Sequence, residues 1–254
     1  SLPLCMNSVA YWFLTSYNRV AISNVLSVSE NGLYSIAGRF SSFITLFTTC
    51  FNMAWQEMSY SREAQKQTNQ GGFYTTALNS YIKFLCMGLL MLIPAISVIF
   101  PIMINESYAD AKQLVPYYLL ATIVSCISSF FGNIFTAIKK NNVLFYTTVA
   151  GSVVNVVSVH LLLPVVGVQG ASIALFLGFM VNNAIRAYLL KKEIQVSIDL
   201  KFIIAWAIVY IGVSYIYLHA NAIINVLTVF VGGLLTLFVF RKELKEILGT
   251  IKNR

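Results

Sequence analysis

Two arginines interrupt otherwise apolar stretches of this chain, and they are the residues best placed to bind something. Arg19 lies about eight residues before the end of an apolar run over 4–27, and Arg39 lies about six residues into a second run over 33–56. At 1.5 Å per helical residue, Arg19 is about 12 Å from the end of the first run, and Arg39 is about 9 Å from the start of the second. If the runs form a helical hairpin, both cations lie at similar depth.

No acidic residue within either run can neutralise these charges, because Glu57 lies at the far end of the second run. A charge near the middle of a membrane costs roughly 2.5–3.5 kcal/mol on insertion scales, and such residues usually face a bundle interior or a water-filled cavity. We therefore interpret Arg19 and Arg39 as part of an anion-binding cavity. The alternative is that each arginine caps backbone carbonyls or extends to the lipid headgroups.

A stripe of polar side chains accompanies the two arginines. Steps of three and four residues place the polar side chains of the second run on one helical face, namely Ser35, Arg39, Ser42, Thr45, Thr49, Asn52 and Gln56. In the first run, Thr15 and Asn18 lie beside Arg19. Ordinary helix packing would explain small hydroxyls. Amides and arginines along the whole stripe favour a wet surface, so we predict that these residues line the cavity.

The sequence offers no reaction. All acidic residues fall in connections, at the ends of apolar runs or in the tail, and no DxD, HExxH, GxSxG or phosphate-cradling loop occurs. The four cysteines lack the spacing of a metal site or a disulfide framework. We expect a protein that binds and conducts its substrate rather than an enzyme, without a metal or another cofactor.

The composition indicates the elements that must hold these residues. The chain has 254 residues, of which 58% are hydrophobic and only 10% charged, whereas a soluble domain carries about 25% charged residues. A membrane-spanning helix needs about 20 apolar residues, and eight runs qualify: 4–27, 33–56, 79–103, 114–138, 143–163, 168–190, 200–218 and 222–240. We predict an all-α integral membrane protein with about eight transmembrane helices. The polar connection over 57–78 is expected to hold a short surface helix.

The net charge of +8 is explained mainly by membrane topology. Lys112 is the one cation in one set of alternate connections, while twelve lie in the other set and the tail: Arg62, Lys66, Lys139, Lys140, Lys191, Lys192, Lys201, Arg241, Lys242, Lys245, Lys252 and Arg254. This bias predicts a cytoplasmic C-terminus and makes nucleic-acid binding an unlikely explanation. Lys83 and Arg186, near cytoplasmic ends of their runs, are expected to extend to the headgroups.

Three segments resemble a known family. They are Ser16-Tyr17-Asn18-Arg19, then Gly32-Leu33-Tyr34-Ser35-Ile36-Ala37-Gly38-Arg39, and Gly167-Val168-Gln169-Gly170-Ala171-Ser172. The first two are similar to the Ser-x-Asp-Arg and Gly-x-Tyr-Ser-x-Ala pattern of Wzx-like polysaccharide and O-antigen flippases, and the third to their Gly-x-x-Gly-Ala turn. These flippases belong to the multidrug/oligosaccharidyl-lipid/polysaccharide exporter superfamily.

The resemblance implies an architecture. The chain corresponds to the second lobe plus two extra helices of a fourteen-helix exporter: residues 1–190 a six-helix lobe, 191–240 two peripheral helices and 241–254 a basic cytoplasmic tail. Because the chain begins Ser1-Leu2-Pro3, without Met or a secretory signal, we expect an internal boundary of a longer protein.

The resemblance also implies a function: flipping of undecaprenyl-pyrophosphate-linked oligosaccharide across the bacterial inner membrane by alternating access. Arg19 and Arg39 would attract the pyrophosphate, the polar stripe would contact sugars, and apolar surfaces would face the polyprenyl tail and the bilayer. Other glycan-assembly proteins are expected partners. Asn18 stands where the family often has Asp, which puts coupling to protons or sodium through that position in doubt.

Three alternatives remain open. A drug or metabolite exporter of the same superfamily would share the fold, although export of cations would favour acidic residues within the spans. A membrane enzyme of glycan assembly would need a reactive acid or histidine facing a cavity. A scaffold of a glycan-assembly complex would pack Arg19 and Arg39 against carbonyls.

Overall fold

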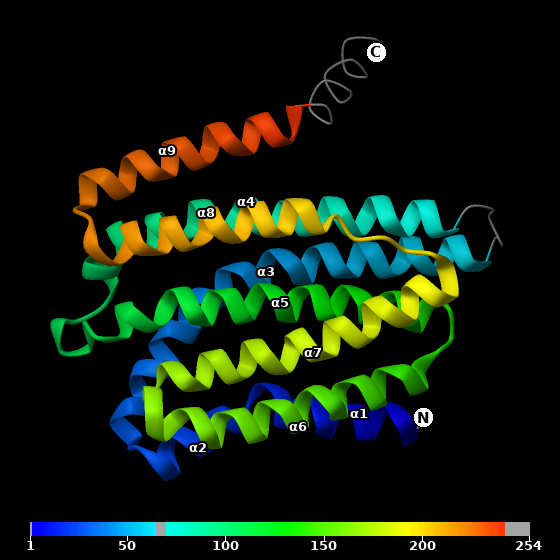
Figure 1. The fold of residues 1–254 in the computed structure, drawn as a ribbon, viewed down its shortest axis with the longest axis horizontal. Helices are drawn as coiled ribbons and strands as arrows, with labels where there is room; N and C mark the ends of the chain where they lie inside the picture. The colour runs from blue at the N-terminus through cyan, green and yellow to red at the C-terminus, as the bar shows by residue number, and fades with distance from the viewer. Residues whose placement is uncertain (1, 65–69, 242–254) are drawn as a thin grey trace. The chain divides into compact units, whose positions relative to one another are not determined.

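The computed structural model describes residues 2–64 and 70–241, and for residues 2–6, 62–64 and 70 it describes the backbone alone. All regular structure in these ranges is helical (Figure 1). The prediction of an all-α fold is therefore confirmed. Contacts divide the chain into two compact units, Ser1–Ile82 with Asp110–Asp199, and Lys83–Ala109 with Leu200–Arg254. Residues 242–254 of the predicted tail over 241–254 lie outside the described residues, as do the side chains of Arg62 and Lys66.

The first unit contains six complete helices and the beginning of α4 (Gln70–Met103). The complete helices are α1 (Leu2–Thr15), α2 (Tyr17–Val25), α3 (Val28–Ala64), α5 (Ala111–Ala137), α6 (Asn141–Val166) and α7 (Gln169–Ile194). Within this unit α6 packs along α7, α1 packs on α6, and α5 lies between α3 and α7 (Figure 1).

Two glycines allow α6 and α7 to approach each other closely. A Cβ built on Gly151 would lie 2.7 Å from the Gly178 carbonyl oxygen, and one on Gly178 would lie 2.8 Å from the Gly151 carbonyl oxygen. Real side chains do not reach such distances, so the crossing requires glycine on both helices. Small residues at helix crossings are typical of membrane proteins, where backbone contact replaces the hydrophobic driving force.

The turn between α6 and α7 explains the Gly-x-x-Gly-Ala segment. Gly167 ends α6 with a φ of 67°, which residues other than glycine adopt only with strain. A Cβ on Gly170 would lie 2.7 Å from the Leu162 carbonyl carbon. Both glycines are thus required by the tight reversal that starts α7 beside the end of α6.

The second unit consists of Lys83–Met103 of α4, a 3₁₀ turn over Glu106–Tyr108, α8 (Leu200–His219) and α9 (Ala222–Val239). The Trp206 indole donates to the Cys86 carbonyl oxygen at 2.8 Å and ties α8 to α4. Gly232 of α9 faces Met91 of α4. The Lys83 ammonium lies 5.9 Å from the centre of the Phe202 ring, a cation–π contact within the unit. Its extension to the headgroups stays a prediction.

Six of the described helices are long and apolar enough to cross a membrane: α4 to α9. The chain is a multi-pass membrane protein. The first two predicted spans differ from expectation, because the run over 4–27 breaks at Ser16 into α1 and α2, and α3 carries too many polar residues to qualify. The polar connection predicted over 57–78 is also shorter. Nothing in 57–64 breaks a helix, so α3 continues to Ala64, and α4 already begins at Gln70.

Candidate functional site

The break between α1 and α2 places Arg19 against α3. α1 ends at Thr15, and α2 begins at Tyr17. Arg19 is exposed, and its Nη2 atom lies 3.6 Å from the position that a Cβ on Gly38 would take. The Tyr118 hydroxyl lies 3.1 Å from the same point. Because Gly38 immediately precedes Arg39, the guanidinium of Arg19 reaches the turn of α3 that carries the second arginine.

Neither arginine has a carboxylate partner among the described residues. Arg39 is exposed like Arg19, and neither forms an ion pair with a carboxylate of the described residues. The ion pair in this part of the chain joins Lys140 and Glu193, at the opposite end of the first unit. Two exposed guanidinium groups without a carboxylate offer donors suited to a bidentate anion such as a phosphate.

The polar stripe of α3 has a graded exposure. Arg39, Ser42, Thr45 and Thr49 are exposed, and Ser35, Asn52 and Gln56 are half-buried. The opposite face buries Ile44, Thr48 and Trp55. The hydroxyls of Ser35, Thr45 and Thr49 donate to carbonyls of their own helix, which satisfies them without a partner element. Exposed Phe43, Leu46 and Phe47 flank the stripe, so this surface of α3 is amphipathic rather than uniformly polar.

Three amides join the stripe to α5. Gln56 Nε2 donates to Asn133 Oδ1 at 2.8 Å, and Asn133 Nδ2 donates to Asn52 Oδ1 at 3.3 Å. Asn133 belongs to a half-buried row on α5, Ser125, Ser129, Asn133 and Thr136. The hydrogen bonds show that the row of α5 lies beside the stripe of α3 and continues its polar surface.

Asn18 differs from the other predicted cavity residues because it is fully buried. Its Nδ2 donates to the Ala171 carbonyl oxygen at 2.8 Å, and its Oδ1 accepts from Asn155 Nδ2 at 2.9 Å. Asn18 therefore ties α2 to α6 and α7 instead of facing a cavity. Thr15 is half-buried and donates to the Tyr11 carbonyl oxygen. Both hydrogen bonds of Asn18 are to neutral groups, the Asn155 amide and the Ala171 carbonyl.

Arg186 was misjudged from the sequence. It does not extend to the headgroups: it is 5% exposed and donates within the helix bundle. Its Nη1 donates to the Ser128 carbonyl oxygen at 2.7 Å and to the Ser128 hydroxyl at 3.0 Å, while Nε and Nη2 donate to the hydroxyls of Thr147 and Thr148. Oxygens from α5 and α6 accept four hydrogen bonds from the guanidinium inside the protein. The signal in the sequence was the polar pair Asn182 and Asn183 one turn earlier.

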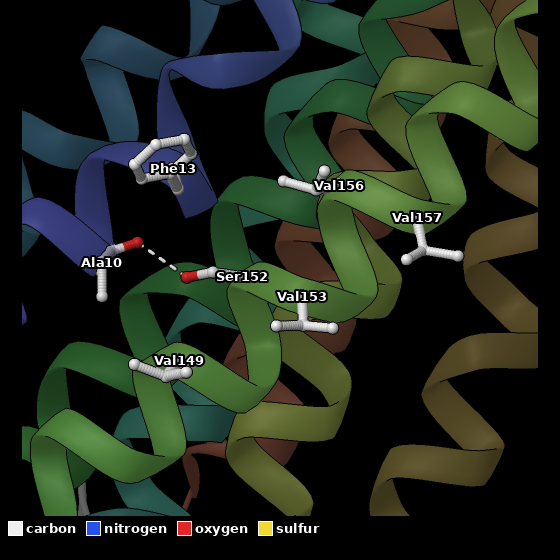
Figure 2. A pocket seen from close by; sticks show the side chains of 7 residues that line it. All are labelled: Ala10, Phe13, Val149, Ser152, Val153, Val156 and Val157. Carbon is white, nitrogen blue, oxygen red and sulfur yellow. Dashed lines mark hydrogen bonds between the residues drawn. The ribbon is translucent and has the colours of Figure 1, made fainter.

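One pocket of about 320 Å³ lies between α1 and α6 (Figure 2). Its lining is apolar apart from Ser152, and consists of Ala10, Phe13, Val149, Ser152, Val153, Val156 and Val157. The Ser152 hydroxyl donates to the Ala10 carbonyl oxygen at 2.7 Å, as the dashed line in Figure 2 shows. The pocket therefore suits a hydrocarbon chain and not an anion. The described residues contain no cluster of three or more His, Cys, Asp or Glu that could hold a metal ion.

Comparison with known proteins gives one solved structure with a significant likeness. The structure is lipid II flippase MurJ in an inward closed conformation, and it superposes with a TM-score of 0.66 and 18% sequence identity. The chain shares the fold of part of this flippase. The match covers 93% of the chain but 53% of the MurJ structure, so the chain spans about half the length of that protein. No protein-family model and no curated protein sequence matches the chain.

Proposed function

We propose that this protein moves a lipid-linked oligosaccharide across the membrane, with undecaprenyl pyrophosphate as the lipid carrier. The observation that supports the proposal most directly is the placement of the Arg19 guanidinium against Gly38, next to Arg39, with no carboxylate of the described residues paired to either. Uncompensated guanidinium groups attract a pyrophosphate through charge-assisted hydrogen bonds. The fold shared with part of a lipid II flippase supports the same kind of substrate.

The structure also offers surfaces for the sugars and for the prenyl chain of the proposed substrate. The amide chain of Gln56, Asn133 and Asn52 presents planar donors and acceptors for sugar hydroxyls. The pocket between α1 and α6 has the apolar lining that a prenyl chain requires. We propose that Ser35, Ser42, Thr45, Thr49, Asn52 and Gln56 line the path of the glycan, in surface polysaccharide or O-antigen biosynthesis.

The Lys and Arg distribution supports a cytoplasmic C-terminus, and the resemblance to polysaccharide flippases supports a bacterial inner-membrane location. In this orientation, Arg19 and Arg39 lie toward the outer leaflet. They would act on the pyrophosphate late in its passage, when the cavity opens outward.

Complementation of surface-glycan display tests the proposal. The full-length gene carrying both Arg19→Ala and Arg39→Ala should fail to restore display in a strain lacking it, at normal protein abundance. Lys191→Ala, which removes an exposed cation from the last turn of α7, is the matched control and should restore display. Normal display from the well-expressed double variant would overturn the proposal.

A further inference from the structure

A second positively charged site lies in the first unit, away from Arg19 and Arg39. Arg186 is eight residues before the end of α7, or about 12 Å along the helix, at the end of the unit where α6 begins. All of its hydrogen-bond acceptors, in Ser128, Thr147 and Thr148, are neutral oxygens. A buried charge is stable only when it is hydrogen-bonded and electrostatically compensated. Hydrogen bonds are present here, but a counter-charge is not among the described contacts.

Asn182 supplies the second observation. It is 1% exposed, and neither its Nδ2 nor its Oδ1 has a hydrogen-bond partner. A buried amide that makes no hydrogen bond costs about 1–3 kcal/mol, so such a side chain requires an explanation. Asn182 lies one helical turn before Arg186, and side chains at this spacing are neighbours on a helix, about 5–6 Å apart at Cβ.

Both side chains face the same stretch of α6. The Asn182 Cβ lies 3.2 Å from the position of a Cβ on Gly151, and Arg186 Nη2 donates to the hydroxyl of Thr148, one turn before Gly151. The guanidinium has five N–H groups and makes four hydrogen bonds. An unused guanidinium N–H and an unused amide N–H therefore lie on neighbouring side chains of one buried interface.

We propose that Arg186 and Asn182 bind a small monovalent anion, of the size and charge of chloride, between α6 and α7. The anion would accept from the free N–H groups of both side chains and would compensate the buried guanidinium. It would stabilise the packing of α5, α6 and α7. This site is independent of the proposed function, because it shares no residue with the Arg19 and Arg39 region.

Thermal unfolding of the purified full-length protein tests the site. Replacing sodium gluconate by sodium chloride at constant ionic strength should raise the unfolding temperature saturably, by about 2–4 °C. Sodium bromide should act like chloride, and sodium sulfate should not, because a divalent anion is too large and too highly charged for the site. Equal unfolding temperatures in gluconate and chloride would overturn the proposal.

Two variants test whether the chloride-dependent increase in unfolding temperature arises at Asn182. Asn182→Leu should abolish the chloride-dependent increase while it keeps the same number and branching of side-chain heavy atoms. Asn183→Leu is the matched control, because Asn183 is the next buried amide but donates to the Val124 carbonyl oxygen of α5. This variant should unfold at a lower temperature yet keep the full chloride increment. If Asn182→Leu retains the increment, or if Asn183→Leu loses it as well, the anion does not bind at Arg186 and Asn182.

Discussion

The Arg19 guanidinium lies beside Gly38: its Nη2 atom is 3.6 Å from the position that a Cβ on that glycine would take, which is van der Waals contact. The Tyr118 hydroxyl lies 3.1 Å from the same position, and Tyr118 also packs edge-on against Tyr34 with ring centres 4.9 Å apart. Three elements, α2, α3 and α5, thus meet at the glycine before Arg39. The missing side chain of Gly38 lets Tyr118 approach α3 closely, and the Arg19 guanidinium lies beside this contact.

Gly38→Leu should therefore displace Arg19 and reduce glycan display by tenfold or more. A Cβ at this buried position would already lie 3.1 Å from the Tyr118 hydroxyl and 3.2 Å from its ring carbon Cζ. The substitution should therefore also lower the unfolding temperature, and display is compared at matched protein abundance. Gly88→Leu is the control, because a Cβ on Gly88 has no neighbour within 4 Å. Display equal to wild type from Gly38→Leu would show that the position of Arg19 is unimportant.

The glycine crossing of α6 and α7 predicts a loss of stability. Gly151→Val would force the two backbones apart, since even a Cβ would lie 2.7 Å from the Gly178 carbonyl oxygen. Overpacking of this kind costs about 1–3 kcal/mol, which should lower the unfolding temperature in detergent by several degrees. Gly212→Val, at a glycine with open space around it, should change the unfolding temperature little. An unchanged value for Gly151→Val would contradict the described crossing.

Because the Asn18 amide is buried and hydrogen-bonded, we expect a carboxylate at this position to destabilise the fold. In Asn18→Asp the donor to the Ala171 carbonyl oxygen is lost, and two acceptors face each other in a buried site. The expected cost is about 1–3 kcal/mol, measured as a lower unfolding temperature. Asn24→Asp makes the same chemical change at an exposed position of α2 and should be nearly neutral. A more stable Asn18→Asp protein would mean that this site accommodates a negative charge.

Breaking the amide chain between α3 and α5 should reduce transport of the substrate without reducing the amount of folded protein. Asn133→Leu removes the central member, which both accepts from Gln56 and donates to Asn52. If these amides contact sugars, glycan display should decrease severalfold at unchanged protein abundance. Asn142→Leu, at an exposed position near the start of α6, provides the comparison. Equal display from the two variants would show that these amides do not contact the substrate.

The sequence predicted the helical membrane fold well, because a run of about 20 apolar residues has few structures available to it in a bilayer. The spacing of Arg39, Ser42 and Thr45 indicated that they share one face of α3; that this face lines a cavity stays a prediction. The sequence could not predict the break at Ser16, since no Pro or Gly marks that position. Just after the break, Asn18 bonds to Asn155 and Ala171 of two other helices, contacts that depend on tertiary packing.

Arg186 shows a second limit of the sequence. Its distance from the end of α7 allows an extended side chain to reach the headgroups, and position alone cannot separate that arrangement from burial. What decides between them is the set of oxygens in Ser128, Thr147 and Thr148. These residues lie on two other helices, so their convergence on one guanidinium depends on how α5, α6 and α7 pack.

The most direct test of the central claim is the affinity of the purified full-length protein for a polyprenyl pyrophosphate, compared with the matching polyprenol. Hydrogen bonds to charged groups contribute roughly 1.5–3 kcal/mol each, so the Arg19→Ala and Arg39→Ala double variant should bind the pyrophosphate at least about tenfold more weakly. Its affinity for the uncharged polyprenol should be unchanged. Equal pyrophosphate affinity in wild type and double variant would contradict the assignment of Arg19 and Arg39 as the anion site.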